Sequence, residues 1–100
     1  MPPSRLLAAA VLAAGLPAMP LAQAAGPAPL AAQGCLGCHG PDGTGMGAIP
    51  RLAGREAPEL AAILRDYRAD RRPATIMNRI ARGYTEAEID SVSAWFAAVR

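Results

Sequence analysis

Two cysteines and the only histidine lie close together in the chain, as Cys35-Leu36-Gly37-Cys38-His39. In a helical turn, residues at positions i, i+3 and i+4 project from one side, so these three side chains can face one common ligand. Thiols can form thioether bonds, and an imidazole nitrogen can bind iron. The C-x-x-C-H spacing is typical of the attachment site of a c-type haem. Cys35 and Cys38 would then bond the porphyrin, and His39 would be the proximal iron ligand.

Three other uses of the cysteine pair fit the sequence less well. A thioredoxin-like C-x-x-C requires a βαβ surround, and no strand-like run of β-branched or aromatic residues flanks this one. A zinc knuckle requires a second pair of ligands, whereas the chain has no further histidine and no third cysteine. A disulfide between Cys35 and Cys38 would close a very small loop and constrain little of the chain.

The N-terminal segment has the features of a secretory signal. Arg5 gives a short positive region, residues 6–16 form a run of small apolar residues, and Ala22-Gln23-Ala24 matches an A-x-A cleavage site. A membrane anchor is the alternative interpretation. Pro17 and Pro20 interrupt the apolar run, which is too short to span about 30 Å of hydrocarbon. We therefore predict export to the periplasm and cleavage, with no stable membrane insertion afterwards.

The predicted signal peptide covers residues 1–24 and the predicted mature domain covers residues 25–100. A domain of this size cannot bury a large core from side chains alone. A covalently held haem would act as a crosslink and would also fill core volume. We therefore expect one domain with one haem c as its cofactor.

All ten basic residues are arginines, against eight acidic residues, which gives a formal net charge of +2. Eight of these arginines lie within residues 51–82, where only four acidic residues occur. An asymmetry of this kind can steer a charged partner. The alternative is a set of i,i+4 ion pairs on solvated helices.

Four short helices are predicted, and no strand, so the fold class is all-α. The first helix, over Pro29–His39, carries the haem motif, and three more are expected over residues 56–70, 74–83 and 85–100. The second has apolar residues at positions i, i+3, i+4 and i+7, namely Leu60, Ile63, Leu64 and Tyr67.

The predicted helix ends carry recognisable signals. Thr85-Glu86-Ala87-Glu88 is a capping box at the start of the last helix. We expect Arg71-Arg72-Pro73 to stop the second helix and Gly83 to cap the third. Between residues 40 and 47, four glycines predict tight turns. This loop matches no nucleotide-binding fingerprint, and we interpret it as backbone close to the haem edge, with no nucleic-acid partner.

An electron-transfer haem requires a second axial ligand, usually Met or His. With His39 in use, the mature domain offers Met46 and Met77. Met46 follows His39 by only seven residues and lies on the same side of the ring, so we expect an apolar contact at the haem rim. Met77 follows by 38 residues and has enough slack to reach the distal face. We predict Met77 as the distal ligand; the alternative is ordinary core packing between Ile76 and Ile80.

A histidine that binds a metal normally donates its other N–H to a backbone carbonyl, which fixes the ring. We predict that Pro50 supplies this carbonyl for His39, because a proline pins the loop that covers the proximal side. No pair of carboxylates, no Ser/His/Asp set and no free thiol is left over for acid–base or nucleophilic work. No catalytic residue is therefore assigned.

Three stretches resemble known cytochromes. Cys35-x-x-Cys38-His39-Gly40 and Pro50-x-Leu52-Ala53-Gly54 resemble the haem and proximal loops of small periplasmic di-haem cytochromes. The stretch Thr-Ile-Met-Asn-Arg-Ile-Ala-Arg-Gly-Tyr at residues 75–84, followed by Trp95-Phe96, resembles the cytochrome subunit of flavocytochrome c sulfide dehydrogenase. The resemblance implies a small cytochrome c fold of three to four short helices around one haem, with His39 and Met77 on the iron.

The resemblance also implies a periplasmic one-electron carrier that accepts electrons from an FAD-containing sulfide dehydrogenase subunit and passes them to another redox protein. Many such subunits carry two haems on a longer chain, whereas this sequence has a single motif. Whether the protein belongs to an enzyme complex is therefore left open. The alternatives are a free-standing shuttle between respiratory complexes and, if Met77 does not bind iron, a haem that binds peroxide or a gas.

Overall fold

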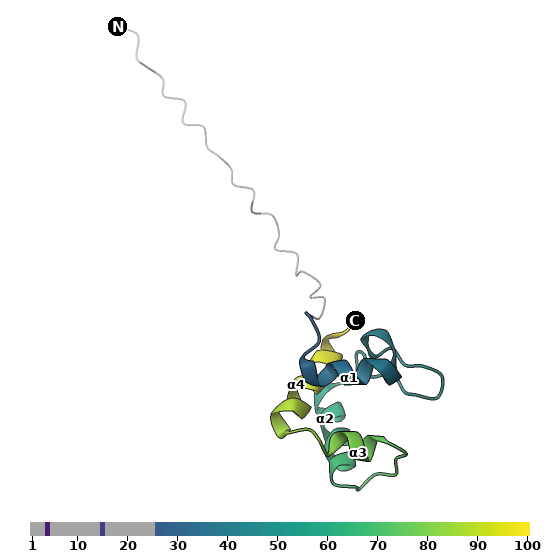
Figure 1. Cartoon of the computed structure of the whole chain (residues 1–100). Helices are drawn as coiled ribbons and strands as arrows, with labels where there is room; N and C mark the ends of the chain where they lie inside the picture. Colours follow the sequence, from purple (N-terminus) through teal and green to yellow (C-terminus); the bar gives the residue numbers. More distant parts are fainter. Residues whose placement is uncertain (1–3, 5–14, 16–25) are drawn as a thin grey trace.

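The computed structural model describes residues 4, 15 and 26–100. The predicted signal peptide therefore lies outside the described residues, apart from Ser4 and Gly15. None of the helices in the described part is long and apolar enough to cross a bilayer. That part contains no strand, which agrees with the all-α prediction. Its elements, shown in Figure 1, are α1 (Leu30–His39), η1 (Pro41–Gly43), α2 (Ala57–Arg68), α3 (Met77–Ala81) and α4 (Glu86–Ala98).

Helices α2 and α4 form the centre of the fold. They pack against each other, α3 packs on α2, and α1 packs on α4. A core of Ala32, Leu60, Val92 and Phe96 joins α1, α2 and α4. Phe96 is only 1% exposed, and burying a side chain of this size stabilises the fold by about 2 kcal/mol. Its ring meets Trp95 edge to face, with the two ring centroids 4.9 Å apart.

The start of α4 confirms the predicted capping box. The Thr85 side chain accepts a hydrogen bond from the backbone N–H of Glu88 at 3.1 Å, and the Glu88 carboxylate accepts one from the backbone N–H of Thr85 at 3.2 Å. Two of the backbone donors at the helix start are thus satisfied. The acidic side chains in the first turn also lie at the positive end of the helix dipole.

The predicted end of the second helix is wrong. α2 ends at Arg68, before Arg71-Arg72-Pro73 is reached, and Ala69 is its cap. Asp70 then adopts a left-handed conformation with φ 57°. This residue turns the chain so that the backbone N–H of Arg71 donates to the carbonyl of Asp66 at 2.8 Å. A left-handed aspartate therefore ends the helix, because Asp tolerates this conformation better than most residues do.

The predicted role of Gly83 is also wrong. The third helix is shorter than expected and ends at Ala81, with Arg82 as a right-handed cap at φ −61°. The backbone N–H of Gly83 donates to Ile80 at 3.2 Å, and that of Tyr84 donates to Ala81 at 3.1 Å. These three-residue hydrogen bonds tighten the end of the helix, so no left-handed glycine is needed.

At Gly43, in the loop after α1, the backbone packs closely against helix α4. Its φ is +72°, and a Cβ at this position would lie 2.5 Å from the Phe96 ring. The Gly43 carbonyl accepts hydrogen bonds from the backbone N–H groups of Leu52 at 2.8 Å and Ala53 at 3.0 Å. Only glycine meets both the conformational and the steric requirement here.

We predict that Gly43→Ala lowers the free energy of unfolding by about 3 kcal/mol, because it adds both backbone strain and a clash with Phe96. Gly47→Ala is the matched control, since φ is +56° there but a Cβ would meet nothing within 4 Å. It should cost only about 1 kcal/mol. Urea denaturation of the two purified variants measures both values, and equal losses would contradict the close approach of Phe96.

Candidate haem-binding site

The last turns of α1 carry the C-x-x-C-H motif. Cys35 is partly buried, Cys38 is exposed, and His39 is buried at 7% exposure. Their i, i+3, i+4 spacing on a regular helix points the three side chains to one side. The helix itself therefore presents the two thiols and the imidazole as a unit.

A short hydrogen bond orients the buried imidazole of His39. Its Nδ1 atom lies 2.7 Å from the backbone carbonyl oxygen of Pro50, as the sequence predicted. A carbonyl can only accept a hydrogen bond, so Nδ1 must carry the proton and donate it. The neutral ring then has its lone pair on Nε2, which is the nitrogen available to a metal.

The loop that carries Pro50 is fixed by backbone hydrogen bonds. Met46 and Ile49 exchange two of them, at 3.1 and 2.9 Å, and form an isolated bridge. The backbone N–H of Gly45 donates to the carbonyl of His39 at 2.6 Å. The same loop is thus bonded to the motif just before it presents the Pro50 carbonyl. This rigidity fixes the direction of the His39 ring.

Tyr84 lies beside the first cysteine of the motif. Its hydroxyl donates to the carbonyl of Ala31 at 2.9 Å and lies 3.9 Å from the Cys35 sulfur. Burial raises the pKa of the Cys35 thiol, which keeps the thiol protonated at neutral pH. Burial also raises the pKa of Tyr84 to about 12. The sequence indicates Tyr84 only as an aromatic residue that lines the haem or packs between helices, and it does not reveal the hydrogen bond to Ala31.

Met77 is on a different element from the motif. It is partly buried and is the first residue of α3. Its neighbours Ile76 and Ile80 are 53% and 38% exposed, so they do not form the apolar core that the packing alternative requires. Met46, the other candidate, is 54% exposed in the loop after α1.

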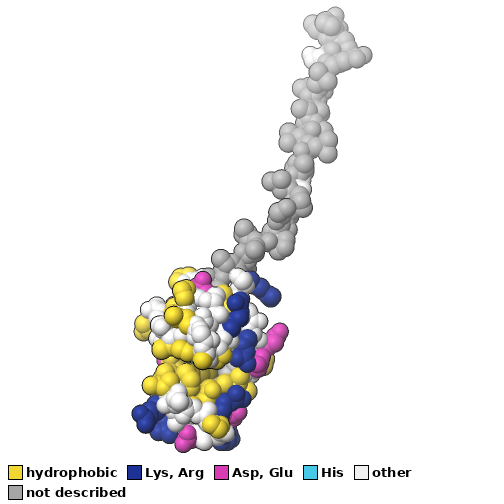
Figure 2. All heavy atoms as spheres, turned by 90° about the vertical axis from the view of Figure 1, so that its right-hand side faces the viewer, with side chains coloured by type: hydrophobic (Ala, Val, Ile, Leu, Met, Phe, Trp, Pro, Cys, Tyr) yellow, Lys and Arg dark blue, Asp and Glu magenta, His cyan; other side chains and the backbone are white. Residues whose placement is uncertain are grey.

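An apolar surface lies on the side of the molecule that carries these elements. In Figure 1, α1 and the loop after it lie above α3, with α2 between them. Figure 2 views that right-hand side and shows hydrophobic side chains gathered across its middle. A covalently attached haem needs such a surface, two thiols to bond the porphyrin and an imidazole whose free Nε2 can bind the iron. The donor set and the apolar surface therefore fit a covalently bound haem.

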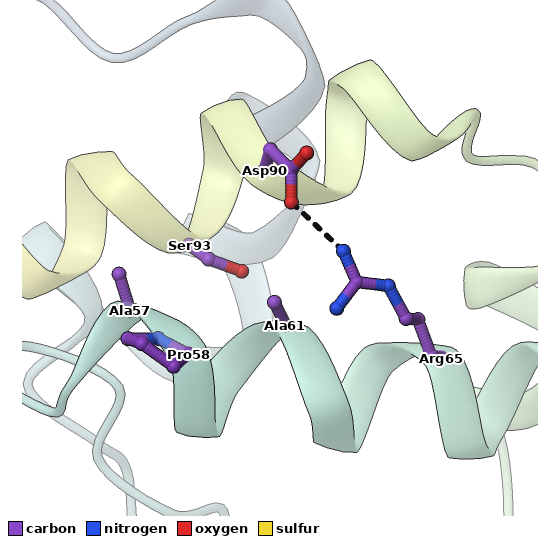
Figure 3. A pocket seen from close by; sticks show the side chains of 6 residues that line it. All are labelled: Ala57, Pro58, Ala61, Arg65, Asp90 and Ser93. Atoms are coloured by element: carbon purple, nitrogen blue, oxygen red, sulfur yellow. Dashed lines mark hydrogen bonds and ion pairs between the residues drawn. The ribbon is translucent and has the colours of Figure 1, made fainter.

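A hollow of about 280 Å³ lies between α2 and α4 (Figure 3). The Arg65 guanidinium donates to the Asp90 carboxylate at 3.0 Å on its rim. The Ser93 hydroxyl in its wall is buried and has no hydrogen-bond partner among the described residues. The lining contains no thiol or imidazole, so this hollow is separate from the haem motif. Its lining residues are Ala57, Pro58, Ala61, Arg65, Asp90 and Ser93.

The fold and the site define a c-type cytochrome. Residues 23–99 match the cytochrome c family model, so the chain belongs to the cytochrome c family. Proteins of this family bind haem c covalently and carry electrons. The predicted family, fold and cofactor are thereby confirmed.

Three individual proteins show which cytochromes the chain is similar to. The chain is 37% identical over 62 residues to the cytochrome subunit of sulfide dehydrogenase from Chlorobaculum tepidum, covering 62% of this chain and 56% of that one. It is 42% identical over 69 residues to a thiosulfate dehydrogenase electron acceptor from Stutzerimonas stutzeri, covering 65% and 32%. The cytochrome c4 structure from Acidithiobacillus ferrooxidans matches with a TM-score of 0.63 and 37% identity, over 65% of this chain and 38% of that chain. The chain thus spans between about a third and just over half of these proteins.

We predict that Tyr84 ionises well above the usual tyrosine value of about 10, because partial burial of its phenol disfavours the charged form and raises its pKa. Its folded-state pKa is raised, so its contribution to stability is complete below pH 10 and is lost as the pH rises toward 12. Tyr67→Phe leaves Tyr84 as the only tyrosine, so an ultraviolet titration reports on it alone. Ionisation near pH 10 in the folded protein would show that the phenol is not buried.

Proposed function

We propose that this protein is a periplasmic one-electron carrier, with haem c bonded to Cys35 and Cys38 and its iron bound by His39 and Met77. The observation that carries the proposal is the hydrogen bond from His39 Nδ1 to Pro50, which leaves Nε2 available on the same side of α1 as the two thiols. When bound, haem c supplies reversible one-electron oxidation and reduction of its iron.

Each residue then has a separate task. The Cys35 and Cys38 sulfurs hold the ring covalently. The Pro50 carbonyl orients His39 and makes its Nε2 a stronger donor. The thioether of Met77 is a ligand that raises the reduction potential of a haem iron. Apolar side chains on the same side of the molecule exclude water and favour transfer of an electron without a proton.

As the partner, we propose an FAD-containing sulfide dehydrogenase subunit. Support comes from the similarity to the cytochrome subunit of sulfide dehydrogenase from Chlorobaculum tepidum and from the resemblance of residues 75–84 to the same family. The predicted signal peptide supports the periplasm as the compartment in which the two proteins interact. The electron would then pass from the flavin subunit to this protein and on to another redox protein.

The distribution of ion pairs favours docking of a partner protein beside α3. Arg65 and Arg68 are paired with Glu86, so the acidic start of α4 is neutralised. By contrast, Arg72 and Arg79 are exposed and form no ion pair with any described residue; the Arg72 guanidinium lies 5.7 Å over the ring of Tyr67. A partner with an acidic surface would therefore be attracted toward the segment that carries Met77.

A free-standing carrier is the second candidate. The chain contains a single C-x-x-C-H motif, and it is similar to thiosulfate dehydrogenase electron acceptors from two organisms. Such a protein would collect electrons from a different donor and would form only brief complexes. Its haem chemistry would be the same, so only the donor distinguishes the two candidates.

Replacing the distal ligand tests the iron coordination. We predict that Met77→Leu abolishes the weak red absorption band of the oxidised protein that arises from sulfur bound to iron, and that it lowers the reduction potential. Met46→Leu is the matched control and should leave both properties unchanged. Visible spectroscopy and a redox titration measure the effects. A wild-type spectrum in Met77→Leu, or loss of the band in Met46→Leu, would contradict this assignment.

Stopped-flow spectroscopy tests which enzyme donates electrons to the haem. Sulfide together with an FAD-containing sulfide dehydrogenase subunit should reduce the haem quickly, and sulfide alone should reduce it much more slowly. Arg79→Glu should slow this reduction several-fold at low salt and less at high salt, because exposed charges are screened. Arg100→Glu makes the same change in charge at the chain end and should have a smaller effect. Reduction by a thiosulfate dehydrogenase but not by the flavoprotein would favour the second candidate.

A further inference from the structure

Tyr84 is bonded to three helices and lies next to the fourth. Its hydroxyl donates to the carbonyl of Ala31 in α1 at 2.9 Å. Its backbone N–H donates to Ala81 in α3 at 3.1 Å, and its carbonyl accepts from the Arg68 guanidinium of α2 at 3.4 Å. The next residue, Thr85, is the N-cap of α4. No other described residue makes hydrogen bonds to α1, α2 and α3 together.

Helix α3 needs such an attachment. It has only five residues, and its N-cap, Ile76, makes no side-chain hydrogen bond. A helix of this length is unstable on its own. The Asn78 side chain donates to Asp70 in the loop before α3 at 3.2 Å and accepts from the backbone N–H of Arg79 at 3.0 Å, and the Arg82 guanidinium lies 3.5 Å from the Asp70 carboxylate. These contacts hold α3 to its own neighbouring loop and not to the helix that carries the haem motif.

We propose that Tyr84 is a positioning residue: its hydroxyl fixes the segment that carries Met77 at a set distance from α1, and thereby holds the Met77 sulfur on the iron. This inference rests on the proposed role of Met77. One hydroxyl group then connects the two parts of the site, which are the haem motif on α1 and the segment that carries Met77.

The place where Tyr84 meets α1 supports this role. Ala31 and Cys35 are four residues apart and lie on the same side of the helix. The hydroxyl that bonds to Ala31 is accordingly only 3.9 Å from the Cys35 sulfur. Tyr84 therefore contacts α1 on the side that carries the first haem-bonding residue, so any movement of α3 away from that residue has to break the Ala31 hydrogen bond or displace the tyrosine.

The variant Tyr84→Phe removes the hydroxyl and keeps the ring. Imidazole can bind the oxidised iron only where the methionine has left it, so the affinity for imidazole reports how firmly Met77 is held. We expect haem attachment to persist and the affinity for imidazole to rise about fivefold, because one hydrogen bond that opposes the opening is lost. Visible spectroscopy follows the titration of the haem-loaded protein.

The matched control is Trp95→Phe. The Trp95 ring N–H donates to the carbonyl of Gly26 at 2.8 Å, a bond of the same kind that does not involve α3. This variant should lose stability to a similar degree and keep the imidazole affinity of the wild type within about twofold. An equal rise in both variants, or no rise in Tyr84→Phe, would overturn the proposal, since the effect would then be one of general stability.

Hydrogen exchange separates this proposal from the proposed ligation. In Tyr84→Phe the backbone amides of Arg79 and Ile80, which donate to Ile76, should exchange several-fold faster than in the wild type and in Trp95→Phe. This measurement does not depend on sulfur binding to iron. If the wild-type spectrum lacks the red band, the proposed ligation fails while faster exchange still supports the attachment. Unchanged exchange overturns the attachment whatever the spectrum shows.

Discussion

The hydrogen bond from His39 Nδ1 to the carbonyl of Pro50 is the constraint on which the site depends. It decides which imidazole nitrogen carries the proton, and so which one can bind iron. The bond requires the loop after α1 to fold back on the motif, which the Met46–Ile49 bridge and the left-handed glycines make possible. At Gly43 the same loop packs against Phe96 of α4. The proximal side is thus built from the core outward.

Met77, the proposed distal ligand, is positioned differently. Met77 lies on a helix of five residues that packs on α2, and it has no share in the core formed by α1, α2 and α4. Its position relative to the motif depends on how the residues after α3 attach to α1, and Tyr84 makes that attachment. Under the proposed ligation, His39 is the firmly positioned ligand and Met77 the more weakly attached one, and Tyr84 is the residue that we propose limits opening of the site.

Much of the site was predictable because its determinants are local. The C-x-x-C-H spacing needs only helical periodicity, and the Pro50 carbonyl needs only the rule that a metal-binding histidine donates its other N–H. The capping box at Thr85 is likewise contained in four consecutive residues. Contacts between distant segments were not predictable in this way. The left-handed turn at Asp70, the approach of Gly43 to Phe96 and the bond from Tyr84 to Ala31 each depend on how helices pack.

We propose that His39, oriented by Pro50, and Met77 together hold the iron. Nuclear magnetic resonance of the reduced, haem-loaded protein tests both ligands in one spectrum. We expect a slowly exchanging His39 Nδ1 proton and a Met77 methyl signal shifted far upfield, because the methyl group of a bound methionine would lie against the face of the porphyrin ring. A Met77 methyl signal in the ordinary methionine region, or a rapidly exchanging His39 Nδ1 proton, would contradict this pair of ligands.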